Sequence, residues 1–289
     1  MTHRSAPEKR SLAERRAFGI INVDKPPGPS SHQVVAWIKE LLDVDAAAHA
    51  GTLDPKVTGC LPVMVGNATR IAQALLVGPK EYVTVLELHD RPPASMSDIL
   101  DTFVGELYQK PPRKSAVTRQ LRTREVYALD VLDTDDRQIL LRIECESGTY
   151  IRKLCHDIGL ALGVGAHMGD LRRTATTPFT DASLVTMHDL ADAIAYAEAG
   201  DPEPLREAIR PAERGLQHLP QVTIAPNAAE QVGHGAPVFA PGVIRADDAA
   251  IDMLVVVATP DGTAIALGRL VGDPDADTGE VVSLERVLV

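Results

Sequence analysis

A single carboxylate stands among turn-forming residues in the segment His49-Ala50-Gly51-Thr52-Leu53-Asp54-Pro55-Lys56-Val57-Thr58-Gly59. Pro55 disfavours helical backbone at the residue before it, so we expect Asp54 to be extended and to project from a loop. In a structural interpretation, the Asp54 carboxylate accepts hydrogen bonds from neighbouring backbone N–H groups. In a functional one, the loop presents the carboxylate to a cleft. The surrounding sequence has to decide between the two.

The residues around this segment predict a domain that mixes strands and helices. An apolar run at residues 19–23 is expected to be a strand that ends at the proline-rich residues 24–29. A helix follows, because Ser30 and Gln33 form a capping-box pair and apolar residues repeat on one helical face as far as Leu42. Further elements are expected as strands at 82–89 and 138–146 and as helices at 154–162, 190–199 and up to residue 209.

From about Leu219 the pattern changes to short β-rich runs separated by Gly, Pro and Asp turns, which is typical of a small β-barrel. These runs are 222–225, 253–258, 264–270 and 281–289. We therefore expect a domain boundary near residues 215–219, with one domain at 18–217 and a second at 218–289. Residues 1–17 are polar and carry no packing signal, so we expect a flexible leader there.

Composition excludes several classes of protein. The 289 residues contain no apolar run long enough to cross a bilayer, and the charged N-terminus is unlike a signal peptide. The three cysteines, Cys60, Cys145 and Cys155, have no C-x-x-C spacing. This argues against a disulfide framework and a zinc ribbon, and it favours a reducing cytoplasm. We expect no metal site and no membrane partner.

The charge of the chain is strongly negative. It carries 40 acidic and 29 basic residues, a net charge of −11, and its basic residues comprise 21 Arg but only 8 Lys. An acidic, Lys-poor chain is suited to a salt-rich interior, where charges are screened beyond roughly 3 Å at about 1 M salt. The rival interpretation is that an acidic face repels nucleic acid.

Five blocks of sequence occur in order along the chain. They are residues 24–31, the Asp54 segment, Lys80-Glu81-Tyr82-Val83, Ser147-Gly148-Thr149-Tyr150-Ile151-Arg152 and residues 165–174. This ordered set resembles the pseudouridine synthases of the TruB/dyskerin family. Residues 111–124, together with His234-Gly235-Ala236-Pro237 and Pro241-Gly242, are similar to the archaeal dyskerin branch. The resemblance covers residues 18–289. It implies an α+β catalytic domain around a mixed, largely antiparallel sheet, with a C-terminal PUA pseudo-β-barrel.

The resemblance also implies roles for individual residues. Asp54 matches the catalytic carboxylate, Arg152 the cation that keeps it ionised, and Tyr82 the ring placed against the extruded uracil. Without the resemblance, Tyr82 would be interpreted as core filling and Arg152 as a surface arginine. Positions that line the substrate pocket are matched by His49, Leu171 and Lys25, with Lys25 in its wall.

A basic segment is the candidate for RNA contact outside the pocket. Between Gln109 and Arg124 there is no acidic residue, and the basic residues are Lys110, Arg113, Lys114, Arg119, Arg122 and Arg124. The plainer alternative is a solvated basic loop. In the PUA-like domain, Gly235 is expected to allow close approach of RNA to the backbone.

The implied reaction converts uridine to pseudouridine in RNA. It breaks the N-glycosidic bond, rotates the uracil and forms a C–C bond, which requires a carboxylate but no cofactor or metal. The dyskerin branch implies a guide RNA and small accessory proteins in a box H/ACA ribonucleoprotein, commonly with ribosomal RNA as substrate. A stand-alone activity on the T-loop uridine of tRNA is the second enzymatic interpretation. The alternative from another class is an RNA-binding scaffold with a vestigial pocket.

Overall fold

The computed structural model describes residues 4–111 and 120–289. Ten of the strands in these residues form one sheet, in which neighbouring strands are antiparallel except for one parallel pair, β3 and β8. Its order is β10 (Arg210–Pro211), β1 (Phe18–Lys25), β3 (Thr58–Gly66), β8 (Ala166–Thr176), β4 (Lys80–Leu88), β7 (Gln138–Cys145), β6 (Arg122–Asp135) and β5 (Gly105–Gln109). Two short strands extend it, β2 (Ala47–His49) beside β3 and β9 (Phe179–Thr180) beside β8. The mixed, largely antiparallel sheet expected from the sequence is confirmed.

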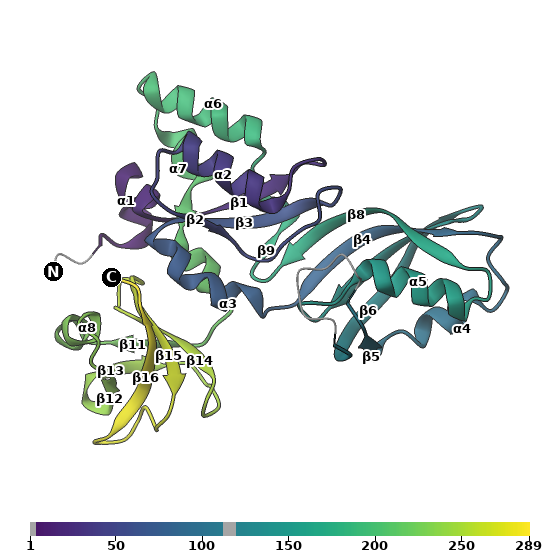
Figure 1. Cartoon of the computed structure of the whole chain (residues 1–289). Coiled ribbons are helices and arrows are strands. Elements are labelled where there is room, and N and C mark those ends of the chain that lie inside the picture. The colour runs from purple at the N-terminus through teal and green to yellow at the C-terminus, as the bar shows by residue number, and fades with distance from the viewer. Residues whose placement is uncertain (1–3, 112–119) are drawn as a thin grey trace.

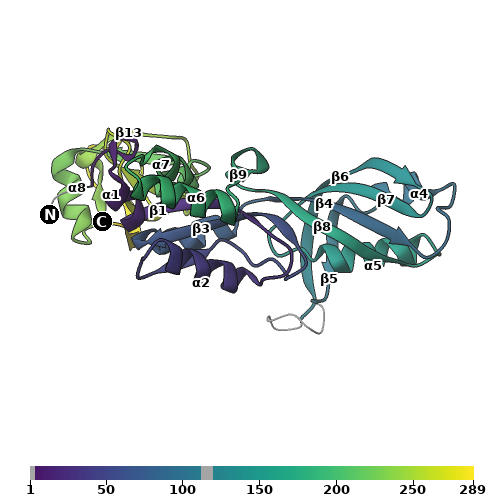
Figure 2. The ribbon, with the colours of Figure 1, turned by 90° about the horizontal axis from the view of Figure 1, so that it is seen from above.

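Helices pack on this sheet at both of its ends (Figures 1 and 2). They are α1 (Leu12–Ala17), α2 (Ser31–Leu41), α3 (Ala72–Leu76), α4 (Met96–Asp101), α5 (Ile151–Ala161), α6 (Met187–Glu198) and α7 (Glu203–Ala208), with short 3₁₀ turns η1 (Pro7–Lys9), η2 (Asn67–Ile71), η3 (Asp181–Ser183) and η4 (Ala212–Leu216). The capping box expected for α2 is present, since the Ser30 hydroxyl accepts from the Gln33 N–H and the Gln33 carboxamide accepts from the Ser30 N–H. Helix α6 begins three residues before the expected start because a second capping box, Thr186 with Asp189, precedes it.

Burial explains why α5 lies where it does. It places Leu154, Cys155 and Ile158 against the sheet, and each such apolar side chain contributes about 1.5–3 kcal/mol. The three cysteines are free and buried. Burial raises the pKa of Cys60 to about 11 and those of Cys145 and Cys155 to about 12. The thiols are therefore protonated at neutral pH and serve as small apolar core groups.

The C-terminal part of the chain forms a separate, six-stranded barrel-like sheet within the described residues. Its order is β12 (Val238–Phe239), β16 (Glu280–Val287), β15 (Ala264–Leu270), β14 (Leu254–Ala258), β11 (Gln221–Ile224) and β13 (Val243–Ala246). Helix α8 (Pro226–Gly233) and the turn η5 (Ala240–Gly242) connect its strands, and α8 packs on β15. The strands expected from the sequence agree with β11, β14, β15 and β16. A small β-barrel at this end of the chain is thus confirmed.

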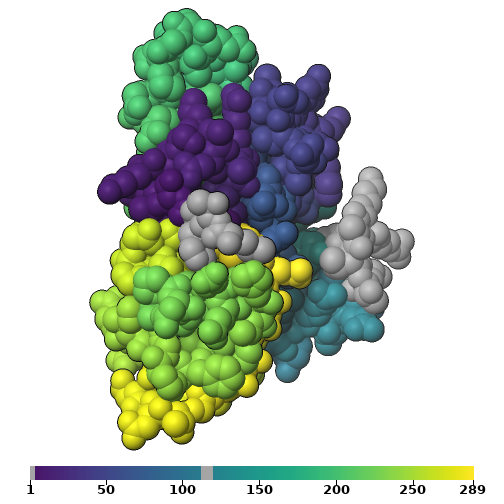
Figure 3. Space-filling view, turned by 90° about the vertical axis from the view of Figure 1, so that its left-hand side faces the viewer, coloured from purple at the N-terminus to yellow at the C-terminus, as the bar shows by residue number. Residues whose placement is uncertain are grey.

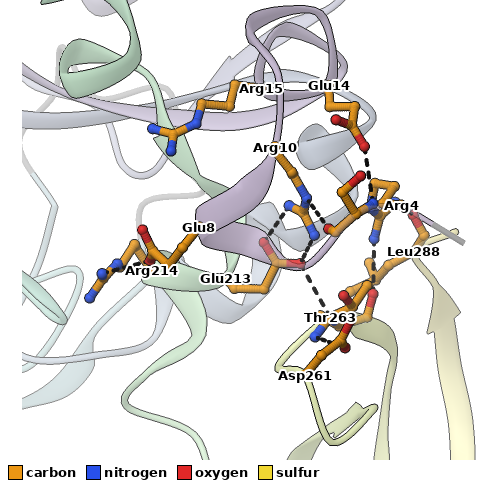
Figure 4. Close-up of polar contacts among 12 residues, drawn as sticks. Arg4, Glu8, Arg10, Glu14, Arg15, Glu213, Arg214, Asp261, Thr263 and Leu288 are labelled. Atoms are coloured by element: carbon orange, nitrogen blue, oxygen red, sulfur yellow. Dashed lines mark hydrogen bonds and ion pairs between the residues drawn. The ribbon is translucent and has the colours of Figure 1, made fainter. Parts of the chain in front are cut away.

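The expectation of a flexible leader is wrong for residues 4–17. A capping box between Ser11 and Glu14 begins helix α1, and the Arg10 side chain is fully buried. Both terminal guanidinium nitrogens of Arg10 donate to the Glu213 carboxylate at 2.7 Å (Figure 4). The physical reason is that the carboxylate that binds Arg10 lies far away in the sequence. The polarity of the N-terminal residues alone therefore gave no sign of packing.

The same N-terminal residues join the two sheets. The Arg4 guanidinium donates to the backbone carbonyls of Leu288 and Ala264, at 2.7 and 2.9 Å. Glu213 accepts a further hydrogen bond from the Ala264 N–H at 3.2 Å. In Figure 3 the N-terminal part of the chain, in purple, lies against the yellow and green C-terminal domain. Beside this joint is a cavity of about 580 Å³, whose lining includes Lys9 and Asp261.

Candidate active site

Asp54 lies in the loop between β2 and β3, and the backbone on both sides of it is fixed. The buried Ser31 hydroxyl both accepts from the Leu53 N–H at 2.8 Å and donates to the Leu53 carbonyl at 3.0 Å. The Val57 N–H closes the turn by donating to the Asp54 carbonyl at 3.0 Å. The carboxylate itself is 54% exposed. The sequence-based expectation of a projecting carboxylate therefore agrees with the geometry, and the purely local capping role does not.

Lys25 supports this loop from below. Its side chain is fully buried, and its ammonium donates to the carbonyls of Pro26, Pro55 and Val57 at 3.0, 3.0 and 2.8 Å. Burial lowers the pKa of Lys25. Its three N–H donors point to the loop carbonyls, and its side chain is covered from solvent. This geometry is that of a support for the Asp54 loop, and a contact between Lys25 and substrate stays a prediction.

Arg152 forms an ion pair with Asp54, as the sequence analysis expected. It is the second residue of α5, and its terminal guanidinium nitrogen contacts Asp54 Oδ2. The Arg152 side chain is 48% exposed. A guanidinium in contact with a carboxylate favours the ionised form of the acid. Because both side chains remain half exposed, the charged pair is open to a molecule arriving from solvent.

Tyr82 and Leu171 lie on neighbouring strands of the sheet, Tyr82 on β4 and Leu171 on β8. Both are partly exposed, and both pack against two apolar clusters, one containing Leu53 beside Asp54 and the other containing Ile151 beside Arg152. Burial raises the pKa of the Tyr82 hydroxyl, and the neighbouring Arg173 guanidinium opposes this shift. The phenol is therefore neutral at neutral pH. An aromatic ring and an aliphatic side chain thus form an apolar floor within the sheet.

Arg173 is the main residue of the site that sequence reasoning missed. It is 2% exposed, and its guanidinium donates to the carbonyls of Cys60 and Gly51 at 2.8 and 3.2 Å. Gly59 faces it across the parallel strand pair with a φ of 96°, and a Cβ there would lie 2.3 Å from the Arg173 carbonyl oxygen. The available signal was a pair of adjacent arginines, Arg172 and Arg173, inside a strand.

His49 lies at the end of β2 and contacts a second residue that was not singled out, His32. Their rings are edge to face, with centroids 4.9 Å apart. Burial, His32 and Arg173, in that order, lower the pKa of His49, so its ring is neutral at neutral pH. Within residues 4–111 and 120–289, the buried Nδ1 of His49 has no hydrogen-bond partner. The two histidines form one edge of the Asp54 loop.

Comparisons with known proteins place this geometry in a family. Consecutive parts of the chain match the DKCLD (NUC011) domain at residues 2–35, the TruB family pseudouridylate synthase N-terminal domain at 39–151, the tRNA pseudouridylate synthase B C-terminal domain at 152–217 and the PUA domain at 220–286. A probable tRNA pseudouridine synthase B from Halobacterium salinarum is 64% identical over 99% of both chains. The chain belongs to the TruB family of pseudouridylate synthases. A protein of the same name from Haloarcula marismortui is 62% identical, over all of this chain and 94% of its own.

Solved structures assign this TruB family enzyme to the branch expected from its motifs. The chain matches one in a crystal structure of a Cbf5-Nop10-Gar1 complex with a TM-score of 0.94 and 45% identity, covering 100% of this chain and 90% of that one. It matches one in an H/ACA ribonucleoprotein bound to a substrate RNA containing 2′-deoxyuridine with a TM-score of 0.93 and 43% identity, covering 99% and 90%. The resemblance to an archaeal dyskerin homologue with a PUA domain is confirmed. The Halobacterium and Haloarcula relatives agree with the acidic, Lys-poor composition.

The basic segment of this family member is described only in part. Arg113, Lys114 and Arg119 lie outside the described residues. Lys110 is exposed, whereas Arg122 and Arg124 are partly buried on β6. Arg124 forms an ion pair with Glu146 at 3.4 Å, on the turn that leads into α5. In the second domain, Gly235 is exposed with a φ of 96° and has open space around its Cα, as close approach of a backbone requires.

The part of the chain that the structure describes contains neither a metal-binding cluster nor a membrane-spanning helix. No cluster of three or more His, Cys, Asp or Glu side chains in residues 4–111 and 120–289 has the arrangement of a metal site. None of the helices in these residues combines the length and apolarity needed to cross a bilayer.

Proposed function

We propose that this pseudouridine synthase uses Asp54 as its catalytic carboxylate and works with a guide RNA. The observation that carries the proposal is the ion pair between Asp54 and Arg152, half exposed above a rigid loop. A positioned, ionised carboxylate is the group that the reaction requires. Attack on the ribose, addition to the uracil ring and removal of a sugar proton each begin from this same charged oxygen.

The chemistry balances without any cofactor. The bond between C1′ and N1 of the uridine breaks, the base rotates, and a bond from C1′ to C5 forms. The hydrogen at C5 leaves as a proton, and N1 gains one. In this proposal Tyr82 stacks on the extruded uracil, and such stacking of an aromatic ring on a base contributes roughly 1–3 kcal/mol. Leu171 and His49 border the same base.

The guide-directed form of the reaction is supported by the likeness to chains in Cbf5-Nop10-Gar1 and H/ACA ribonucleoprotein structures. We accordingly propose that the partners are a guide RNA, an RNA substrate such as ribosomal RNA, and small accessory proteins. Lys110, Arg122, Arg124 and Gly235 are the described residues offered for RNA contact. The free, buried thiols support a location in a reducing cytoplasm.

A second substrate, tRNA, is supported by the names of the curated relatives, which are probable tRNA pseudouridine synthases. The two substrates are separated by one assay run twice. Purified protein is given bare tRNA, and then a guide RNA, its target and the accessory proteins. Product in the second run alone selects the guide-directed form. Product in the first run establishes the stand-alone activity.

The test of Asp54 uses RNA labelled with tritium at C5 of uridine, because C–C bond formation releases that hydrogen. We expect Asp54→Asn to lower the release rate at least about 10²-fold while RNA affinity stays within about twofold. Asp45→Asn, an exposed aspartate in the connection before β2, is the matched control and should keep the parental rate. Tritium release by Asp54→Asn at the parental rate would reject the assignment and favour the scaffold alternative.

A further inference from the structure

Gln109 makes an unusual contact at the end of β5. Its side chain is buried, with the residue 2% exposed, and both polar atoms of its carboxamide bind the backbone of one residue, Tyr150. Gln109 Oε1 accepts from the Tyr150 N–H at 2.9 Å, and Gln109 Nε2 donates to the Tyr150 carbonyl at 3.3 Å. Buried amides are almost always hydrogen-bonded, but two bonds to a single peptide position fix both its place and its orientation.

The residue held in this way begins the helix that carries Arg152. Tyr150 is the N-cap of α5, its own side chain makes no capping hydrogen bond, and Arg152 follows two positions later. The Tyr150 carbonyl also accepts from the N–H groups of Lys153 and Leu154, both at 3.0 Å. Gln109 therefore binds the same carbonyl that starts the hydrogen-bond ladder of α5, and it sets the direction of the first turn.

Because the ion pair between Asp54 and Arg152 is exposed, its geometry depends on backbone contacts such as those of Gln109 with Tyr150. Arg152 and Asp54 are each about half exposed, so packing around their side chains does not hold them in register. Their geometry depends on the backbone beneath them. Asp54 has Ser31 and Lys25 as backbone supports, and Gln109 is the corresponding support for Arg152.

We infer that Gln109 is a positioning residue for Arg152, which rests on the proposed role of the Asp54–Arg152 pair. It acts through the Tyr150 backbone and does not touch the reacting atoms. Gln109 lies opposite Arg122 in the pairing of β5 with β6, so the strand pair that bears Arg122, and that Lys110 follows, is tied directly to the helix of Arg152. The side-chain amide of Gln109 thereby aligns Arg152 with Asp54.

The first test replaces Gln109 by Met, which has similar length but makes neither hydrogen bond. Tritium release is measured in single turnover at saturating RNA, and RNA affinity is measured separately. We expect the rate at saturation to fall about 10–100-fold, because a misplacement of the order of 1 Å has that consequence, while affinity stays within about twofold. Gln138→Met, at an exposed position on β7, is the matched control and should have the parental rate.

The second test uses Gln109→Glu and a pH profile. An ionised carboxylate still accepts from the Tyr150 N–H but repels the Tyr150 carbonyl, whereas the protonated acid donates to that carbonyl as the amide does. Burial raises the pKa of such a carboxyl. The charged groups on the segments around it are Lys110, the next residue, Arg122, its partner across β6, and Arg124 with Glu146 at the turn before α5. These are common to variant and parent, so the ratio of variant to parental rate should rise as the pH falls.

The outcomes separate the inference from the proposed function. A parental rate at saturation in Gln109→Met, or a change in RNA affinity alone, would overturn the positioning role. A flat ratio across pH in Gln109→Glu would also contradict it, and that variant provides the answer if Gln109→Met does not fold. If the parental enzyme releases no tritium, or if Asp54→Asn is as fast as the parent, the proposed function itself fails.

Discussion

Two arginine–carboxylate pairs in this molecule have opposite surroundings. At the joint between the domains, the Arg10 side chain is fully covered and makes two hydrogen bonds of 2.7 Å to Glu213, whose side chain is 14% exposed. In the proposed active site, Arg152 and Asp54 remain 48% and 54% exposed. The first pair contributes to structure because its charges are covered and bind each other and nearby backbone groups. The second keeps its charges open to solvent.

The comparison shows how the enzyme obtains rigidity where it needs exposure. A covered pair is fixed by its own hydrogen bonds, and removing one member leaves an uncompensated charge. An exposed pair has to be fixed through the backbone, which here is held by Lys25, Ser31 and Gln109. Stability and catalytic geometry should therefore respond to different substitutions.

The largest effect is expected at the covered pair. Glu213→Ala leaves the Arg10 guanidinium buried without its carboxylate and removes the acceptor of the Ala264 N–H. We expect the free energy of unfolding to fall by about 3–5 kcal/mol. Urea denaturation at constant salt measures this loss. The matched control is Glu8→Ala, which breaks an exposed pair with Arg214 and should lower the free energy of unfolding by no more than about 1 kcal/mol. Equal losses in the two variants would contradict the distinction.

The next effect concerns a covered cation, Lys80, which donates to the Leu75 carbonyl at 3.1 Å. Burial lowers its pKa from 10.5 to about 8. Between pH 8 and 10.5 the unfolded chain therefore binds more protons at this residue than the folded one, so stability rises with pH, and the gain is lost as the pH falls through 8. Relative to Lys80→Met, the parent should gain up to about 3 kcal/mol across this window.

The Lys80 prediction is measured as the unfolding free energy of parent and variant at several pH values. Lys39→Met, at an exposed position on α2, is the control and should follow the parental pH dependence. A difference between the parent and Lys80→Met that stays constant from pH 7 to 10 would show that Lys80 does not lose its proton in this range.

A smaller effect, on rate, is expected when the support of the exposed pair is removed. Lys25→Met keeps the length of the side chain but removes three hydrogen bonds to the carbonyls around Asp54. We expect the single-turnover rate at saturating RNA to fall about 10–100-fold, with RNA affinity within about twofold, because the carboxylate loses alignment. Tritium release and a binding assay measure the two quantities. A large loss of affinity with an unchanged rate would instead make Lys25 a substrate contact.

The sequence predicted those features that depend on residues close together along the chain. Asp54 and Arg152 were singled out because five ordered blocks resemble the TruB/dyskerin family, and the barrel was predicted because short apolar runs alternate with turns. The burial of Arg10 and Arg173 was not predicted, because charged residues are rarely covered and their partners lie 203 and 113 positions away. The capping box at Ser11 and Glu14 was a local signal for α1 that polarity concealed.

The smallest effect on stability is expected at the proposed catalytic carboxylate, Asp54. Asp54→Asn removes one charge of an exposed pair, and such pairs contribute about 0–1 kcal/mol to stability. The variant should therefore unfold within about 1 kcal/mol of the parent although its reaction is lost. The Asn side chain also stays close to the solvent, so no charge is left buried. A loss near that expected for Glu213→Ala would mean that Asp54 holds the loop together. Its carboxylate would then be a structural group, and the contrast between the two pairs would disappear.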